Sequence, residues 1–254
     1  MRILLINPNT SGSMTERMVA SASRSLAPDV ELVALTAPRG MPYIASRAES
    51  VIAGATTLEL IAEHQDSFDA VVIGAFGDPG LIAARELFDL PVTAMAEAAM
   101  LTACMVAQRF SIVTFSRTLT AWYEDAVALS GLQARFAGIR VPNVPFVSID
   151  DVQGELESEL VELCLRAVEA DGSDAVILAG APLTGLAAKV ADRVPVPLID
   201  PLDAAIGQAA LLARLRTSPA RAGRFARPPS KVATGLSPAL GSWIERQESA
   251  AGIG

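Results

Sequence analysis

The sequence predicts an α/β protein made of two similar halves, each with a mostly parallel sheet, and three observations support this prediction. Short apolar runs alternate with helical segments along the chain. A strand-and-turn pattern at residues 69–81 returns at residues 174–186, 105 positions later. The chain has 254 residues, of which 51% are hydrophobic and 19% charged, so it can bury a substantial core.

The repeated pattern is a buried strand that leads into a glycine-rich turn. In the first copy, four apolar residues precede Gly74, and the turn contains Gly77 and Gly80. In the second copy, a similar run ends near Gly180. A repeat of this length indicates a pseudo-two-fold axis. Such an axis would make the two strand ends, near Ala75 and Gly180, face each other across one cleft.

The elements of the first half follow from apolar runs and the breakers between them. A helix is expected from Met14, with Thr10, Ser11 or Ser13 as its N-cap. The remaining expected elements are strands at 2–6, 30–35, 69–73 and 91–95, and helices at about 46–63, at 82–88 and from 97.

The second half repeats this alternation. The expected strands lie at 110–116, from 174, and at 196–199, with an extended, proline-containing segment at 141–147; the expected helices lie at 118–129, 155–170 and 202–214. The tail from Thr217 contains four prolines and is expected to be irregular. We expect one lobe at 1–95 plus 207–254, which includes the C-terminal tail, and a second lobe at 96–206.

Ligands in parallel α/β folds bind beyond the carboxyl ends of the strands. This rule predicts that four turns border one cleft, at residues 7–13, 75–80, 114–118 and 180–185. The first turn is rich in hydroxyls and amides and runs into a helix N-terminus, where free N–H groups suit a carboxylate or an imide oxygen. The alternative is that these side chains only cap the helix. A P-loop and a dinucleotide fingerprint are both missing from the sequence.

Composition excludes several classes of protein. A formal net charge of −8 argues against nucleic-acid binding and against binding to anionic membranes. We expect a cytoplasmic protein, since no apolar run reaches the roughly 18 residues of a membrane span and the N-terminus does not resemble a signal peptide. Cys104 and Cys164 lie in apolar helical stretches and His64 in a polar one, so no metal site is expected.

Three runs of residues carry a resemblance to a known family. Residues 6–15 contain Asn-Pro-Asn-Thr-Ser followed by Met-Thr, residues 76–81 read Phe-Gly-Asp-Pro-Gly-Leu, and the turn at 180–185 matches in the second half. Together they resemble the aspartate/glutamate/hydantoin racemase superfamily, in particular its hydantoin and allantoin racemase branch. The resemblance covers nearly the whole chain. It implies two Rossmann-like lobes with an active site between them, no cofactor, a small-molecule substrate and a homo-oligomer.

The resemblance also shows what this chain lacks. Racemisation of a carbon acid needs a base on one face and an acid on the other. The family usually supplies two cysteines, which would fall at Ala75 and Gly180 in this sequence. Neither residue can carry a proton, and the two cysteines of the chain lie in helices far along the sequence from either turn.

Three interpretations follow from the missing thiols. The first is non-thiol hydrolase or lyase chemistry on a small carboxylate, amide or cyclic imide or ureide, because such reactions need at most one proton donor or a positioned water. The second is a racemase or isomerase that uses other acid and base groups. The third is a protein that only binds its ligand, since fold does not fix function.

Candidate site residues come from the four turns and from the loop that contains Tyr43. Each catalytic candidate has a structural alternative: Ser116 can cap the following helix, Asp78 can hold its own turn, and Tyr43 can pack beneath its loop. The catalytic candidates are Ser116, Asp78 and Tyr43. The expected substrate-binding residues are Asn9, Thr10, Ser11, Ala75, Phe76, Gly77, Thr114, Gly180, Ala181, Pro182 and Thr184.

Overall fold

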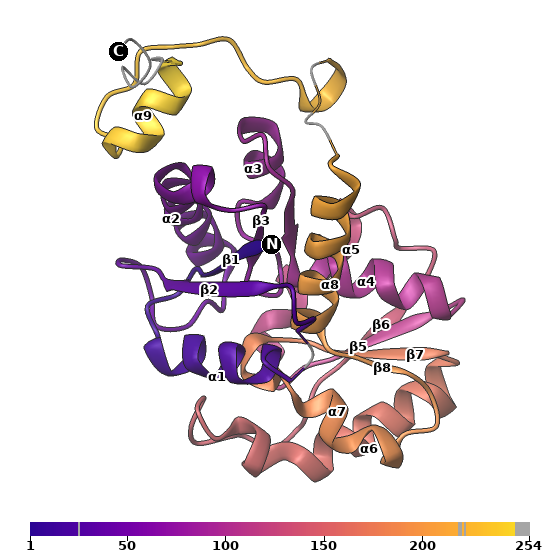
Figure 1. Ribbon diagram of the computed structural model, residues 1–254. Coiled ribbons are helices and arrows are strands. Elements are labelled where there is room, and N and C mark those ends of the chain that lie inside the picture. Colours follow the sequence, from indigo (N-terminus) through magenta and orange to yellow (C-terminus); the bar gives the residue numbers. More distant parts are fainter. Residues whose placement is uncertain (25, 218–219, 221, 247–254) are drawn as a thin grey trace.

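The computed structural model describes residues 1–24, 26–217, 220 and 222–246, and it contains two four-stranded parallel sheets (Figure 1). The strand orders are β2-β1-β3-β4 and β6-β5-β7-β8, so the second sheet repeats the first. This arrangement confirms the predicted α/β class with two parallel sheets. The strands are β1 (Arg2–Asn7), β2 (Glu31–Thr36), β3 (Ala70–Ile73), β4 (Val92–Ala94), β5 (Phe110–Val113), β6 (Phe136–Arg140), β7 (Ala175–Leu178) and β8 (Leu198–Ile199).

Helices cover both sheets and connect consecutive strands, as parallel pairing requires. The α-helices are α1 (Gly12–Ala22), α2 (Arg47–His64), α3 (Leu81–Leu87), α4 (Met95–Val106), α5 (Thr120–Leu129), α6 (Val152–Asp171), α7 (Leu186–Val190), α8 (Pro201–Leu215) and α9 (Pro238–Glu245). In the part of the chain that the structure describes, no helix is long and apolar enough to cross a bilayer.

Alternate residues of the first sheet pack on opposite faces, as the two-residue period of a strand dictates. Leu4 and Ile6 of β1 belong to one cluster of buried residues, which α2, α3 and α9 complete. Ile3 and Leu5 belong to the other cluster, which continues through α1 and α4 into the second sheet. The two halves therefore share one apolar core.

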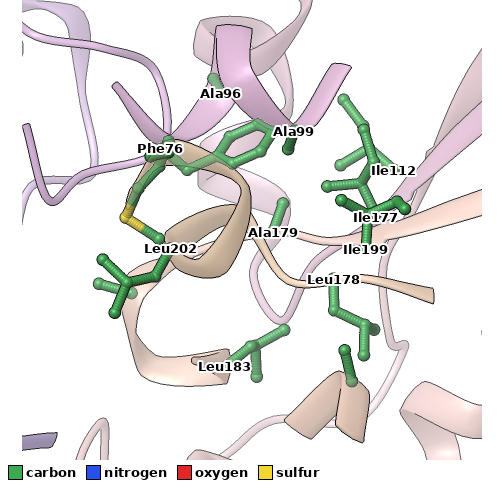
Figure 2. Packing of buried hydrophobic residues seen from close by; sticks show 14 of the residues in the cluster. Phe76, Ala96, Ala99, Ile112, Ile177, Leu178, Ala179, Leu183, Ile199 and Leu202 are labelled. Carbon is green, nitrogen blue, oxygen red and sulfur yellow. The ribbon is translucent and has the colours of Figure 1, made fainter. Parts of the chain in front are cut away.

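The helix that follows the last strand of each sheet packs on the other sheet. Helix α8 contacts β3 and β4 of the first sheet, α4 contacts β7 and β5 of the second, and the two helices pack against each other (Figure 1). Phe76, in the turn after β3, faces Ala96 and Ala99 of α4 within the shared core (Figure 2). Small residues on α4 allow this close approach.

Three segments differ from the sequence-based expectation. A strand that was not predicted, β6, precedes the extended segment expected at 141–147 and ends at Arg140, because Pro142 and Pro145 have no N–H to donate to a ladder. A 3-10 turn occupies Arg117–Leu119, so α5 begins at Thr120. The tail contains α9, which Ser237 caps and which docks Trp243 against Phe88, with ring centroids 5.7 Å apart.

Gly77 and Gly207 allow a matched test of the turn after β3. Gly77 has a φ of +110°, and a Cβ there would overlap the Trp122 ring, so Gly77→Ala should lower the free energy of unfolding by about 2–4 kcal/mol. Gly207 is exposed within α8, and no atom lies within 4 Å of the position of a Cβ there. Gly207→Ala should therefore raise the free energy of unfolding by about 0.5–1 kcal/mol. Urea unfolding measures both effects. A Gly77→Ala protein as stable as the wild type would show that the turn tolerates a side chain.

Candidate active site

A small cavity lies between the two sheets, where the turns after β1, β3 and β7 meet. The turn after β5, the loop after β2, the loop before α6 and helices α1 and α5 complete its wall. Its volume is about 30 Å³, which is room for about two water molecules. The lining residues are Asn9, Ser11, Met14, Pro42, Tyr43, Ile44, Ala75, Phe76, Phe115, Trp122, Tyr123, Ile149, Gly180, Ala181 and Pro182.

The structure brings together part of the set expected from the sequence. Ala75 and Gly180 line the same cavity, so the two repeated turns do meet. The expected residues that line it are Asn9, Ser11, Tyr43, Ala75, Phe76, Gly180, Ala181 and Pro182; those that do not are Thr10, Gly77, Asp78, Thr114, Ser116 and Thr184.

A buried amide network shapes the first turn. The side-chain amide of Asn7 donates to Asn9 Oδ1 at 3.0 Å and to Thr15 Oγ1 at 2.9 Å, and the Ser11 N–H also donates to Asn9 Oδ1. Ser11 caps α1 by accepting from the Met14 N–H at 3.2 Å. The turn is thus fixed from within. Asn7, fully buried, has a structural role that the strand pattern did not single out.

Gly180 has no room for a side chain. Its φ is +115°, and a Cβ would lie 2.6 Å from Cε1 of Phe115 and 3.5 Å from the Tyr123 hydroxyl. The Phe115 ring therefore fills the space that a cysteine side chain at this position would need. Ala75, on the first-half side, is buried at the cavity wall.

Aromatic rings close most of the cavity. The Phe115 ring lies 6.1 Å from the Tyr43 ring and 5.6 Å from the Phe146 ring, between centroids. On the other side, the Phe76 and Tyr123 centroids are 4.6 Å apart. A ligand larger than water requires some of these rings to move.

The cavity contains two phenol hydroxyls. The Tyr43 hydroxyl is buried and has no hydrogen-bond partner among the described residues. Burial raises the pKa of Tyr43, and the nearby Glu49 carboxylate adds to this shift. Burial also raises the pKa of Tyr123, with smaller contributions from Tyr43 and Asp78 that the Thr114 hydroxyl opposes. Nothing in the sequence singles out Tyr123 as a site residue, because an aromatic residue on a helix most often belongs to the hydrophobic core.

Asp78 lies behind the cavity and holds the N-terminus of α4. Its two carboxylate oxygens accept from the Ala96 and Glu97 N–H groups, each at 2.7 Å. Burial raises the pKa of Asp78 to about 7, although these two N–H donors oppose the shift. Glu97 itself pairs with Arg85. Asp78 is therefore positioned to cap α4, a structural role that differs from the hold on its own turn considered from the sequence.

The other expected residues outside the cavity have local partners. The Thr114 hydroxyl donates to the Ala179 carbonyl at 2.9 Å, and the Thr10 N–H donates to the Met41 carbonyl at 2.9 Å. Ser116 shares a hydrogen bond with Thr118 Oγ1 at 2.9 Å. Gly77 packs under Trp122, and Thr184 lines a different pocket.

No acidic, basic or thiol side chain lines the cavity in the described part of the chain. Cys104 is half-buried on α4 and Cys164 is buried on α6, where burial raises the pKa of its thiol to about 12. Nowhere among the described residues do three His, Cys, Asp or Glu side chains gather as metal ligands would. Proton transfer in the cavity would thus depend on phenols, hydroxyls and water.

Comparison with known proteins gives consistent matches along the whole chain. A family model described as Asp/Glu/Hydantoin racemase matches residues 3–209. A hydantoin racemase of Paenarthrobacter aurescens is 33% identical over 233 residues, which cover 91% of this chain and 99% of that protein.

Two solved structures share the fold closely. An allantoin racemase from Klebsiella pneumoniae has a TM-score of 0.88 and 36% identity and covers 94% of this chain and 98% of its own. An allantoin racemase from Pseudomonas fluorescens has a TM-score of 0.83 and 29% identity, with coverages of 92% and 100%.

The titration of Asp78 predicts a pH-dependent stability. Because its pKa of about 7 in the folded protein exceeds the ordinary value of 3.8, the native state binds more protons than the unfolded state between these values. Stability from this group therefore falls as the pH rises from about 4 to about 7. Relative to Asp78→Asn, the wild type should lose about 2–4 kcal/mol of unfolding free energy between pH 5 and pH 8. Urea unfolding of both proteins measures this, and a pH-independent difference would contradict the raised pKa.

Proposed function

Because the chain belongs to the Asp/Glu/hydantoin racemase family, we propose that it is an isomerase that exchanges the proton on an acidic carbon of a small cyclic ureide or imide. A relative that is 33% identical and a solved structure that is 36% identical carry the names hydantoin racemase and allantoin racemase. They favour the isomerase interpretation over the hydrolase or lyase chemistry placed first from the sequence.

The observation that carries this proposal is the pair of phenols in the cavity where thiols are missing. The Tyr123 hydroxyl lies 3.5 Å from the position of a Cβ at Gly180, close to where a side chain at 180 would end. Tyr43 lines the cavity from the loop after β2 and has a hydroxyl free to bond a ligand. In our proposal, one phenol removes the proton from the acidic carbon and the other donates one.

Phenols set the pH dependence of such a reaction. A base must be ionised to accept a proton, and burial raises the pKa of both Tyr43 and Tyr123. Glu49 beside Tyr43 and Asp78 near Tyr123 raise these pKa values further. The phenolate is consequently scarce at neutral pH and increases tenfold with each pH unit, and the rate of proton exchange should follow it.

Substrate binding would use the polar groups of the first turn. Asn9 and Ser11 line the cavity next to Tyr43, where amide and hydroxyl groups suit the carbonyl and N–H edges of a ureide ring. The apolar wall formed by Phe76, Phe115 and Ile149 would exclude water from the reacting carbon.

A second candidate is a reaction that needs only one proton donor, such as decarboxylation, elimination or hydrolysis. One observation favours it: Ala75 and Gly180 carry no proton, and no carboxylate or imidazole lines the cavity among the described residues. A neutral phenol can donate a proton without first ionising. In this case the rate would stay flat over the pH range in which both phenols remain protonated.

Proton NMR in heavy water distinguishes these candidates. With a panel of hydantoins, allantoin, substituted malonates and cyclic amides, we expect the α-proton signal of a cyclic ureide to disappear without new products. New product signals would instead favour the one-proton reaction. A silent panel, combined with saturable binding of one of its members, would overturn catalysis and indicate a binding protein.

Tyrosine variants and a pH profile test the roles of the phenols. Tyr43→Phe and Tyr123→Phe should each lower the exchange rate by about 100-fold or more, since general acid–base groups contribute about 10²–10⁴-fold. The wild-type rate should rise about tenfold per unit between pH 7 and pH 9. Thermal unfolding of each variant controls for folding. A pH-independent exchange rate that survives both substitutions would contradict the phenol mechanism.

A further inference from the structure

A second pocket lies on the opposite side of the turn that forms one wall of the candidate active site. It opens between α1 of the first half and the turn before α7 of the second, which contact each other (Figure 1). Its volume is about 470 Å³, within the range of small-molecule sites. The lining residues are Arg17, Ser21, Arg24, Gln153, Thr184, Gly185, Ala188 and Lys189.

Three cations border this pocket. Arg17 lies on α1, Arg24 follows the C-terminal end of that helix, and Lys189 lies on α7 and lines the same pocket. Among the described residues, no carboxylate forms an ion pair with Arg17 or Arg24, whereas Lys189 pairs with Glu157. On a chain of net charge −8, such a cluster is a local feature and does not reflect the composition.

Hydrogen bonds in both halves of the chain hold the polar groups of the pocket in place. Arg24 Nη2 lies 3.0 Å from Ser21 Oγ and 2.5 Å from the position of a Cβ at Gly185, so this glycine leaves room for the guanidinium. Gln153 Nε2 donates to the Pro182 and Thr184 carbonyls at 2.8 and 2.9 Å. These hydrogen bonds hold the part of the pocket wall that contains Gln153 and Thr184 in place.

Thr184 provides an independent observation. Its side chain lines the pocket and is only 3% exposed, yet its hydroxyl has no hydrogen-bond partner among the described residues. A buried hydroxyl without a partner costs free energy, which a ligand oxygen can recover. Thr184 lines this second pocket and does not line the small cavity between the sheets.

We propose that this pocket binds a small anion of the phosphate class and that the anion bridges the two halves. Guanidinium groups match phosphate oxygens with paired N–H donors, and the Thr184 and Ser21 hydroxyls can donate to the remaining oxygens. Glu157 already pairs with Lys189, so the attraction for an anion comes mainly from the two guanidinium groups of Arg17 and Arg24. This site is independent of the isomerase proposal.

Arg17 connects the pocket to the candidate active site. Its Nη1 donates to the Pro182 carbonyl at 3.4 Å, and its Nη2 donates to the Asp150 carbonyl. Pro182 and the neighbour of Asp150, Ile149, both line the small cavity. An anion that engages Arg17 would therefore shift two parts of the cavity wall, where Trp122 reports the change by fluorescence.

Calorimetric titration with inorganic phosphate at low, constant ionic strength tests the site. We expect saturable binding of one phosphate per chain, weakened at least tenfold in Arg24→Ala and in Lys189→Ala. Arg166→Ala is the matched control, because it removes an equally exposed arginine charge from α6, where Arg166 pairs with Glu162. In a Trp243→Phe background, which leaves Trp122 as the single tryptophan, phosphate should also change the emission.

Three results would overturn the proposal. The first is phosphate binding no tighter than that of chloride at matched ionic strength. The second is a loss of affinity in Arg166→Ala as large as that in Arg24→Ala, which would indicate general charge attraction. The third is full phosphate affinity in folded Arg24→Ala and Lys189→Ala proteins.

Discussion

Two aspartates anchor the turns from which both pockets are built. Asp78, in the turn after β3, binds the first N–H groups of α4, while Asp200 caps α8 and also accepts from the Gly185 N–H, in the turn before α7, at 2.6 Å. Each carboxylate lies at a helix N-terminus, where the N–H groups and the helix dipole favour negative charge. Burial disfavours the charged form of each carboxyl group and raises the pKa of Asp78 and of Asp200. The hydrogen bonds between turn and helix therefore run in opposite directions in the two halves. In the first half, the turn supplies the carboxylate and α4 supplies the N–H groups. In the second half, the N-cap of α8 supplies the carboxylate and the turn supplies the N–H group.

The symmetry of the backbone does not extend to the chemistry of the cavity. The third strands of the two halves lie 105 positions apart and end in equivalent turns. The side chains that close the cavity come unequally from the two halves, because Phe115 and Tyr123 of the second half fill the space around Gly180. The two phenols of the cavity accordingly come from elements that are not equivalent, since Tyr43 lies in the loop after β2 and Tyr123 lies on α5.

The sequence predicted the fold well because the fold depends on local patterns that repeat. Buried parallel strands read as apolar runs, and glycines mark their ends. The strand Phe136–Arg140 escaped detection because it is only half-buried and contains Gly138. The turns of the site were predictable since they follow strands. The side chains that enter the cavity could not be predicted, because Tyr123 looks like a core residue in the sequence. The capping role of Asp78 could not be predicted either, because it depends on a helix 18 residues further along the chain.

The contact between Phe115 and Gly180 has a consequence for how this sequence can change over evolutionary time. Some glycine codons become cysteine codons by one nucleotide substitution, so the genetic code itself is no obstacle to a cysteine at position 180. The structural path is blocked, since Phe115 occupies the space and the backbone has a positive φ. A change at 115 would have to come first. The order of substitutions is therefore constrained, because residue 115 has to change before residue 180 can carry a cysteine.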